Sequence, residues 1–190
     1  MAISKLAGLW TVRTYRDAYK LFMSNGILFN HESEVRGPEF VTRKISMKVA
    51  GIHQGSAEPL ILGNLSAASD WGYAKDYVEG MRKMLQYDIP GDFVMGIGES
   101  HTVRDFVNEA FSVVVMKVKW IENGVDEIGF SDEEKVLVKV SRDLYRPVES
   151  DNYRADYSKA REKLGWEPRV KFKELVRIIV EKDIKLIQHK

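Results

Sequence analysis

Polar side chains follow a short apolar run near the start of the chain. The run spans residues 27–29, and Asn30, His31, Glu32 and Ser33 come directly after it. An apolar run of this length that begins after an Asn-Gly pair is typical of a buried strand. In an open α/β sheet, ligands bind in the crevice beyond the carboxyl ends of the strands. The sequence therefore predicts that these amide, imidazole, carboxylate and hydroxyl groups lie where a ligand binds.

Two cationic side chains stand near the start of the next predicted helix, which spans residues 39–53. Arg43 and Lys44 come shortly after Pro38, a residue suited to the first turn of a helix. Backbone amides at the start of a helix favour phosphate oxygens, and the two charges add to this preference. The alternative is an exposed basic helix face without a ligand, which is common.

The composition is that of an ordinary globular protein. The 190 residues are 44% hydrophobic and 30% charged, with a formal net charge of +1. Such a weak net charge gives no field that attracts nucleic acid or a membrane surface. No apolar stretch approaches the roughly 20 residues of a membrane span, and the N-terminus carries no apolar signal-peptide region. We therefore expect a cytoplasmic protein with no nucleic-acid or membrane partner.

Metal and disulfide chemistry are not expected. The chain has no cysteine, and its four histidines, at positions 31, 53, 101 and 189, form no His-x-x-x-His pair. Without thiolates or paired imidazoles, a dedicated metal site is not predicted. The absence of cysteine also fits the cytoplasm.

The elements that must position these groups alternate between helices and strands. Apolar residues at a helical period predict helices over residues 3–23, 39–53, 102–111, 158–164 and 172–187, with another after residue 72. Short apolar runs predict strands over residues 27–30, 60–62, 93–97, 118–121 and 136–140. This alternation is typical of the α/β class.

Local signals mark several ends of these elements. Thr102 is suited to cap a helix, with Asp105 three residues on, and Gly165 is suited to end one. The Asn-Gly pair at 25–26 is expected to end the first helix, and Asp-Trp-Gly at 70–72 is expected to form a turn.

Helical periodicity also predicts which side chains face the core. Arg13 and Arg16 are expected on an exposed face of the first helix. The core positions predicted in the other long helices are Phe40, Val41, Ile45, Val49, Ile52, Tyr77, Val78, Met81, Met84, Leu85, Phe106, Val107, Ala110, Phe111, Leu175, Val176, Ile179 and Ile184.

Several long segments resemble those of GDP-mannose 4,6-dehydratases, a branch of the extended short-chain dehydrogenase/reductase superfamily. The similar segments are residues 25–33, 40–44, 63–78, 145–149 (Tyr-Arg-Pro-Val-Glu) and 156–168, which contains Leu-Gly-Trp-Glu-Pro. The resemblance covers nearly the whole chain except about 113–135, and it corresponds to the C-terminal half of such an enzyme.

The resemblance implies a fold and a division of the chain. It implies a partial Rossmann-like, doubly wound sheet that lacks its N-terminal strands, together with a smaller C-terminal substrate-binding portion. Residues 1–190 are expected to form a single truncated unit. Within it, residues 1–53 would be a remnant of the dinucleotide-binding domain, and 54–190 would be mostly substrate-binding, with late sheet elements interleaved.

The resemblance also implies ligand contacts. Three residues match positions that contact NADP: Lys5, His31 and Arg36. Five match positions near the sugar nucleotide: Asn30, Val41, Lys44, Arg146 and Glu149. Arginine suits a diphosphate, and a carboxylate can accept hydrogen bonds from guanine. The alternatives are a solvated Lys5, a structural His31, a plain loop charge at Arg36 and a surface salt bridge between Arg146 and Glu149.

The chain departs from the family pattern at places that matter for catalysis. Lys5 matches the lysine of the family's Tyr-x-x-x-Lys pair, but Met1 stands where the tyrosine is expected. No Gly-x-Gly-x-x-Gly occurs, and the family's catalytic Thr and Glu would lie upstream. Ala68-Ser69 replaces Lys-Arg, while Glu34-Val35 and Glu39 replace Pro-Arg and Asn. A thioether cannot transfer a proton, so no complete catalytic set is expected.

The family's reaction removes water from GDP-mannose to give a 4-keto-6-deoxy sugar, with NADP taking and returning a hydride. We expect this chain to be part of such an enzyme and inactive alone. The alternatives are a non-catalytic nucleotide-binding or sugar-nucleotide-binding remnant and an oligomerising module. A sheet without its first strands has an open edge. We therefore expect either a complementing N-terminal half or a homodimer that covers the 27–30 strand and the helix face bearing Leu6 and Trp10.

Overall fold

The computed structural model describes residues 2–146 and 153–188. It contains these α-helices: α1 (Ala2–Tyr19), α2 (Val41–His53), α3 (Ala74–Leu85), α4 (Val103–Val113), α5 (Ser158–Leu164) and α6 (Phe172–Gln188). Two short 3-10 helices, η1 (Gly124–Asp126) and η2 (Arg142–Leu144), lie in the second half of the chain.

The strands are short and form several small sheets. They are β1 (Asn25–Leu28), β2 (Asn30–Glu32), β3 (Leu60–Leu62), β4 (Ala68–Ser69), β5 (Trp71–Tyr73), β6 (Asp92–Met95), β7 (His101–Thr102), β8 (Lys119–Ile121), β9 (Ile128–Phe130) and β10 (Val136–Val140). Three pairs are parallel: β1–β6, β2–β5 and β3–β10. Strands β8, β9 and β10 form an antiparallel run beside β3 in the order β3-β10-β9-β8. Helices interleaved with parallel strand pairs confirm the α/β class.

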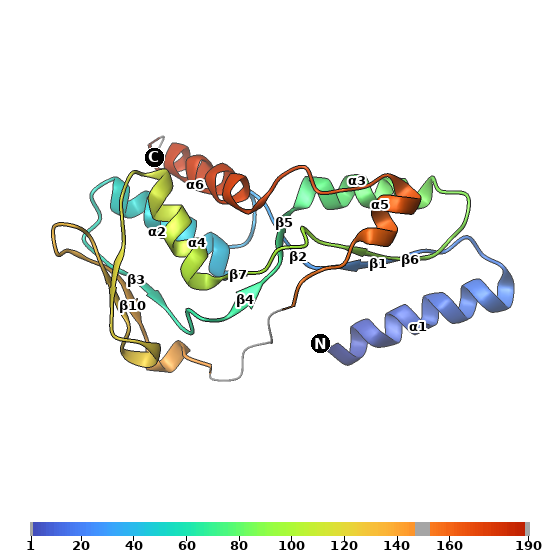
Figure 1. The fold of residues 1–190 in the computed structure, drawn as a ribbon, viewed down its shortest axis with the longest axis horizontal. Coiled ribbons are helices and arrows are strands. Elements are labelled where there is room, and N and C mark those ends of the chain that lie inside the picture. The colour runs from blue at the N-terminus through green and yellow to red at the C-terminus, as the bar shows by residue number, and fades with distance from the viewer. Residues whose placement is uncertain (1, 147–152, 189–190) are drawn as a thin grey trace.

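The molecule is elongated, with two lobes joined by short strands (Figure 1). The large lobe contains α2, α4, α6 and the sheet β3-β10-β9-β8, whereas the small lobe contains α1, α3, α5 and the pair β1–β6. The pairs β2–β5 and β4–β7 lie between the lobes.

The large lobe has a continuous apolar core. Helix α6 packs against both α2 and α4, and their inward side chains meet those of β3 and β10. The predicted core positions in α4 and α6 are confirmed except for Ile184, which is only partly buried, and Ile45, Val49 and Ile52 of α2 are also buried. Helix α4 begins with the predicted capping box, in which Thr102 and Asp105 exchange hydrogen bonds between side chain and backbone.

The small lobe has a compact aromatic cluster of its own. Tyr77 packs edge-on against Trp166, and Phe93 and Met95 of β6 complete the buried centre. The indole Nε1 of Trp166 donates to the carbonyl of Asp76 at 2.8 Å. Trp166 therefore packs against α3. Gly165, at φ 56°, ends α5 in the left-handed conformation, as predicted.

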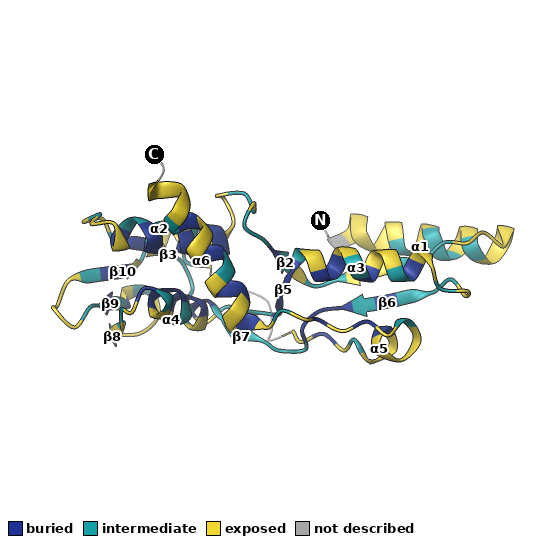
Figure 2. Ribbon diagram, turned by 90° about the horizontal axis from the view of Figure 1, so that it is seen from above, coloured by how far each residue is buried: buried dark blue, intermediate teal, exposed yellow. Residues whose placement is uncertain are grey.

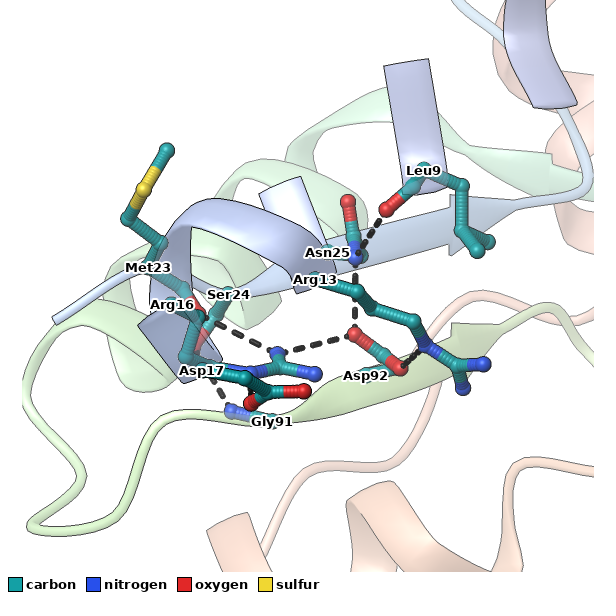
Figure 3. A network of polar contacts seen from close by, with 9 residues as sticks. All are labelled: Leu9, Arg13, Arg16, Asp17, Met23, Ser24, Asn25, Gly91 and Asp92. Carbon is teal, nitrogen blue, oxygen red and sulfur yellow. Dashed lines mark hydrogen bonds and ion pairs between the residues drawn. The ribbon is translucent and has the colours of Figure 1, made fainter. Parts of the chain in front are cut away.

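Charged groups fix α1 to the β1–β6 pair. The Asp92 carboxylate, at the start of β6, receives hydrogen bonds from Arg13, Arg16 and Asn25 (Figure 3). Arg16 also donates to the carbonyl of Met23. Arg16 is only 15% exposed, so the prediction of an exposed position is wrong for Arg16, whereas the Arg13 side chain is 39% exposed. The reason is tertiary, because β6 brings a carboxylate to them from far along the chain.

The first helix and the first strand differ from their predicted bounds. Helix α1 ends at Tyr19 because Lys20 adopts a positive φ of 55°, which a helix cannot continue. Asn25 and Gly26 begin β1 instead of ending the helix. The predicted 27–30 strand is divided into two strands. β1 pairs with β6, β2 pairs with β5, and the change of partner occurs at Phe29.

Asp70 and its neighbours form no simple turn. Trp71 and Gly72 belong to β5, and the fully buried Asp70 carboxylate accepts from the amides of Ile97, Gly98 and Ala155 at 2.8–3.1 Å. This one side chain joins three chain segments.

Some predicted core positions face solvent instead. Tyr77 and Met84 are buried, but Val78 and Leu85 of α3 are 62% and 70% exposed. Phe40 and Val41, at the start of α2, are also exposed. Much of the outer surface of α1 is exposed as well, including Leu6 and Trp10 (Figure 2). These apolar side chains find no partner helix in the part of the chain that the structure describes.

Across residues 2–146 and 153–188, no helix combines the length and apolarity that crossing a bilayer requires. Over the same ranges, no group of three or more histidine or acidic side chains is arranged to hold a metal ion.

Candidate functional site

A hollow of about 420 Å³ lies where the two lobes meet. It is lined from several separate segments, by Asn30, Val41, Leu62, Gly63, Asn64, Ala67, Ala68, Ser69, Trp71, Val103, Leu144 and Arg146. Three of the residues predicted near the sugar nucleotide are therefore brought together: Asn30, Val41 and Arg146.

Strand pairing places Asn30 at the hollow. β2 is parallel to β5, with Asn30 opposite Trp71, so that Ser69 lies on the same face two residues before Trp71. The Asn30 amide Nδ2 donates to Ser69 Oγ at 2.7 Å. The buried Tyr77 hydroxyl lies 3.5 Å from the carbonyl oxygen of Asn30, to which it donates. Both the side chain and the backbone of Asn30 are thus held.

Arg146 reaches the hollow because the chain before it passes very close to β3. Ser141 donates its amide proton to the carbonyl of Leu62 at 2.8 Å. A Cβ at Gly63 would lie only 2.2 Å from the carbonyl oxygen of Leu144, so only glycine allows this approach. The Asn64 side-chain amide then donates to the carbonyl of Arg146 at 3.5 Å, a long bond.

The electrostatic character of the hollow is simple. Among the described residues that line it, Arg146 is the single charged group, and the other polar side chains are those of Asn30, Asn64 and Ser69. A guanidinium favours an anion such as a phosphate. Amide and hydroxyl groups favour the hydroxyls of a sugar. The apolar side chains in the lining, Val41, Leu62 and Trp71, suit contact with a ring.

Lys44, which was also predicted near the sugar nucleotide, is not in this hollow. Lys44 lines a separate groove beside β3 with Pro38, Met47 and Pro59. Glu149 lies outside the described residues. Arg43, which was expected to add charge for a phosphate, is buried and binds elsewhere: it pairs with Asp183 of α6 at 2.8 Å and donates to the carbonyl of Glu34.

His31 has a structural environment. Its ring Nδ1 lies 3.1 Å from the carbonyl oxygen of Phe29, and its ring packs 5.2 Å from that of Tyr77. The next residue, Glu32, is buried and accepts from Thr42 Oγ1 at 2.7 Å. Burial raises the pKa of the Glu32 carboxyl, and the hydrogen bond from Thr42 together with the charge of Arg36 offsets this only in part.

Arg36 lies over Phe40, with its guanidinium carbon 3.5 Å from the ring centre. Its Nε is 3.4 Å from Glu32 Oε2 but buried without a hydrogen-bond partner. The side chain as a whole is 27% exposed, so its accessible guanidinium nitrogens, rather than the buried Nε, are the ones that can pair with an anion. Lys5 is exposed on α1. Neither residue lines the hollow, and nor does His31.

Several lining residues were not among the predicted site residues. Ser69, Asn64 and Leu144 lack any local signal that separates them from ordinary loop residues. Their positions follow from the two-residue pairing of β4 with β7 and from the close approach at Gly63. Gly63 followed by Asn64, directly after the predicted 60–62 strand, marks the end of a strand but does not indicate a ligand site.

Comparison with known proteins identifies similar chains. The family model described as GDP-mannose 4,6 dehydratase matches residues 2–179. GDP-mannose 4,6 dehydratase 2 of Caenorhabditis elegans is 49% identical over 98% of this chain and 49% of its own length. GDP-mannose 4,6 dehydratase of Homo sapiens is 50% identical over 97% of this chain and 50% of its own. The chain thus spans about half the length of the curated relatives it matches.

Among solved structures, RMD from Pseudomonas aeruginosa complexed with NADPH has a TM-score of 0.76 over 97% of this chain and 55% of its own. Its sequence is 15% identical, so this likeness concerns the fold alone.

Proposed function

Because the chain belongs to the GDP-mannose 4,6 dehydratase family, we propose that it forms the sugar-nucleotide-binding part of an enzyme that converts GDP-mannose to GDP-4-keto-6-deoxymannose. The observation that carries the proposal is the shared hollow. Asn30, Val41 and Arg146 lie far apart in the sequence, yet they line one hollow that suits a phosphate and a sugar ring.

Each of the five residues predicted near the sugar nucleotide has a role in this proposal. Arg146 binds a diphosphate oxygen of GDP-mannose through its guanidinium. Asn30 hydrogen-bonds the substrate beside the sugar, and Val41 contacts it through an apolar surface. Glu149, outside the described residues, accepts from guanine, and Lys44 adds positive charge from its neighbouring groove.

The small lobe contributes the remnant of a Rossmann-like sheet. The parallel pair β1–β6, with α1 on one side and α3 and α5 on the other, supports this assignment (Figure 1). Residues 1–53 begin this part, and residues 54–190 supply most of the substrate-binding portion together with the late sheet elements β6 and α5.

We assign NADP as the cofactor, held in part by Arg36, His31 and Lys5. The best fit is at Arg36, because its guanidinium is partly exposed and carries a positive charge that suits a phosphate. When bound, NADP supplies the oxidation and reduction that dehydration requires. The three residues do not form a single hollow with the substrate candidates, and these 190 residues contain no Gly-x-Gly-x-x-Gly. We therefore propose that the chain alone has no dehydratase activity.

Calorimetry with the purified chain tests the proposal. GDP and GDP-mannose should bind, and Arg146→Ala should weaken both about tenfold or more, because a charge-assisted hydrogen bond is lost. Arg142→Ala is the matched control, since Arg142 lies in the same segment but pairs with Asp126 outside the hollow. Equal binding by the wild type and Arg146→Ala would contradict the assignment of Arg146. Turnover of GDP-mannose by the chain alone would contradict its inactivity.

A second role, as an interaction module, is favoured by the exposed apolar face of α1. Ile3, Leu6 and Trp10 are 84%, 57% and 55% exposed along one helix. Within the described ranges, β1 pairs with β6 and with no other strand. Such surfaces are covered in stable proteins. A complementing N-terminal half or a second copy of this chain would cover them. Light scattering that found a stable, non-associating monomer would count against the second copy.

A further inference from the structure

We propose that Ser69 is a positioning residue that orients the Asn30 amide and itself binds the sugar hydroxyls of the ligand. The inference rests on the proposed function of the hollow. It starts from one contact between two lining residues of that hollow, the 2.7 Å hydrogen bond from Asn30 Nδ2 to Ser69 Oγ.

The backbone on both sides of this contact is fixed. Ser69 pairs with His101 across β4–β7, and the next residue is the fully buried Asp70, which accepts from three backbone amides. Asn30 pairs with Trp71 in β2–β5. Two rigid strands therefore hold the two side chains at hydrogen-bond distance before any ligand arrives.

The contact decides which polar atoms remain for a ligand. An Asn side chain offers two N–H donors and one carbonyl acceptor, and a Ser hydroxyl donates one proton while accepting others. With one Asn30 N–H donated to Ser69, the second Asn30 N–H, the Asn30 Oδ1 acceptor and the Ser69 hydroxyl proton remain. An acceptor beside a donor complements neighbouring hydroxyls on a sugar ring.

The other lining residues are consistent with a sugar beside Asn30 and Ser69 and a phosphate beside Arg146. Arg146 carries the one charge among the lining residues that the structure describes, so the phosphate is expected beside it. Asn30 and Ser69 are neutral, and they therefore suit the uncharged sugar better than a phosphate. Ser69 then acts on the sugar part of the ligand alone.

The test compares GDP-mannose with GDP, which has no sugar at that position, by calorimetry on the purified chain. Ser69→Ala should weaken GDP-mannose about five- to tenfold and leave GDP unchanged, because a neutral hydrogen bond and the orientation of Asn30 are lost. Ser69→Thr keeps the hydroxyl and should restore binding. Ser66→Ala, an exposed serine of the preceding loop outside the lining, is the matched control.

A second measurement needs no ligand. In the NMR spectrum, the side-chain amide protons of Asn30 should exchange more slowly in the wild type and in Ser69→Thr than in Ser69→Ala. Unchanged exchange in Ser69→Ala would overturn the proposal, as would an equal loss of affinity for GDP and GDP-mannose. A wild type that binds neither ligand would instead refute the function proposed for the hollow, while the exchange data would still decide whether Ser69 orients Asn30.

Discussion

The two lobes bury their apolar surface to very different extents. In the large lobe, α4 and α6 turn complete apolar faces into one core, and residues such as Phe106 and Leu175 are fully buried. In the small lobe, α1 leaves Leu6 and Trp10 exposed and is held by the Arg13, Arg16 and Asp92 network instead (Figure 3). Apolar packing thus supports the large lobe, whereas charge pairing is the main visible support of α1.

The largest effect is expected in the core of the large lobe. Phe106 packs against Trp71 and Phe172, with ring centres 5.5 and 5.9 Å away. Phe106→Ala should lower the free energy of unfolding by about 3–5 kcal/mol, because a buried aromatic side chain is lost and a cavity remains. Urea denaturation measures the change. Phe22→Ala, at a side chain 47% exposed, is the control and should cost less than about 1 kcal/mol. Similar losses for both variants would break the contrast between the lobes.

A smaller and more local effect is expected for the charge network of α1. Asp92→Asn removes the acceptor charge from Arg13 and Arg16 and should cost about 1–3 kcal/mol, as when a hydrogen bond to a charged group is lost. Amide hydrogen exchange should accelerate about tenfold or more in α1 and little in α4 or α6. Asp88→Asn, at an exposed residue shortly before β6, is the control. Unchanged exchange in α1 would show that packing, not charge, holds it.

The same network predicts a pH dependence. Burial alone would raise the pKa of the Asp92 carboxyl, but hydrogen bonds from Arg16, Asn25 and Arg13 outweigh it and lower the pKa to about 2 from its ordinary 3.8. Below pH 3.8 the unfolded chain therefore takes up a proton at Asp92 before the folded chain does. The stability from this group should be complete above about pH 4 and should fall by roughly 1–2 kcal/mol as the pH drops to 2.

The difference in unfolding free energy between the wild type and Asp92→Asn isolates this contribution. Burial raises the pKa of Glu32 and Asp183, so these groups act in the opposite direction but equally in both proteins. A difference that stays constant between pH 6 and pH 2 would contradict the prediction.

The smallest effect on stability is expected at the exposed face of α1. Leu6→Gln should change the unfolding free energy by less than about 0.5 kcal/mol, because Leu6 is already 57% exposed. If this face joins two copies of the chain, the same variant should shift light scattering toward the monomer. Wild-type and variant chains with the same mass would remove Leu6 from any interface.

The sequence predicted the large lobe better than the small one for a physical reason. Helices α4 and α6 are long, amphipathic and buried on one face, so their periodicity indicates both their bounds and their core residues. Strands β4, β5, β7 and β9 have two or three residues each and carry no period that can be recognised. Trp71 and Gly72 therefore looked like a turn. The end of α1 depended on the positive φ of Lys20, for which lysine gives no signal.

The lining of the hollow could be predicted at positions that belong to the family motifs. It could not be predicted where tertiary contacts determine the direction of a side chain. Motif positions identified Asn30, Val41 and Arg146, which line one hollow. The same reasoning expected Arg43 to face a phosphate, yet Asp183 on α6 holds it in the interior. Lys44 stands one helical turn after Val41 but lines a different groove, which the spacing alone could not indicate.

The buried carboxylate of Asp70 has a consequence for how a ligand would be received. The carboxylate accepts hydrogen bonds from the backbone amides of Ile97, Gly98 and Ala155. It thereby joins the chain after β6 and the chain before α5 to the strands that line the hollow. These three segments are therefore joined before any ligand binds. The contacts for a ligand would be pre-organised, so that little of the binding free energy would be lost in rearranging the protein.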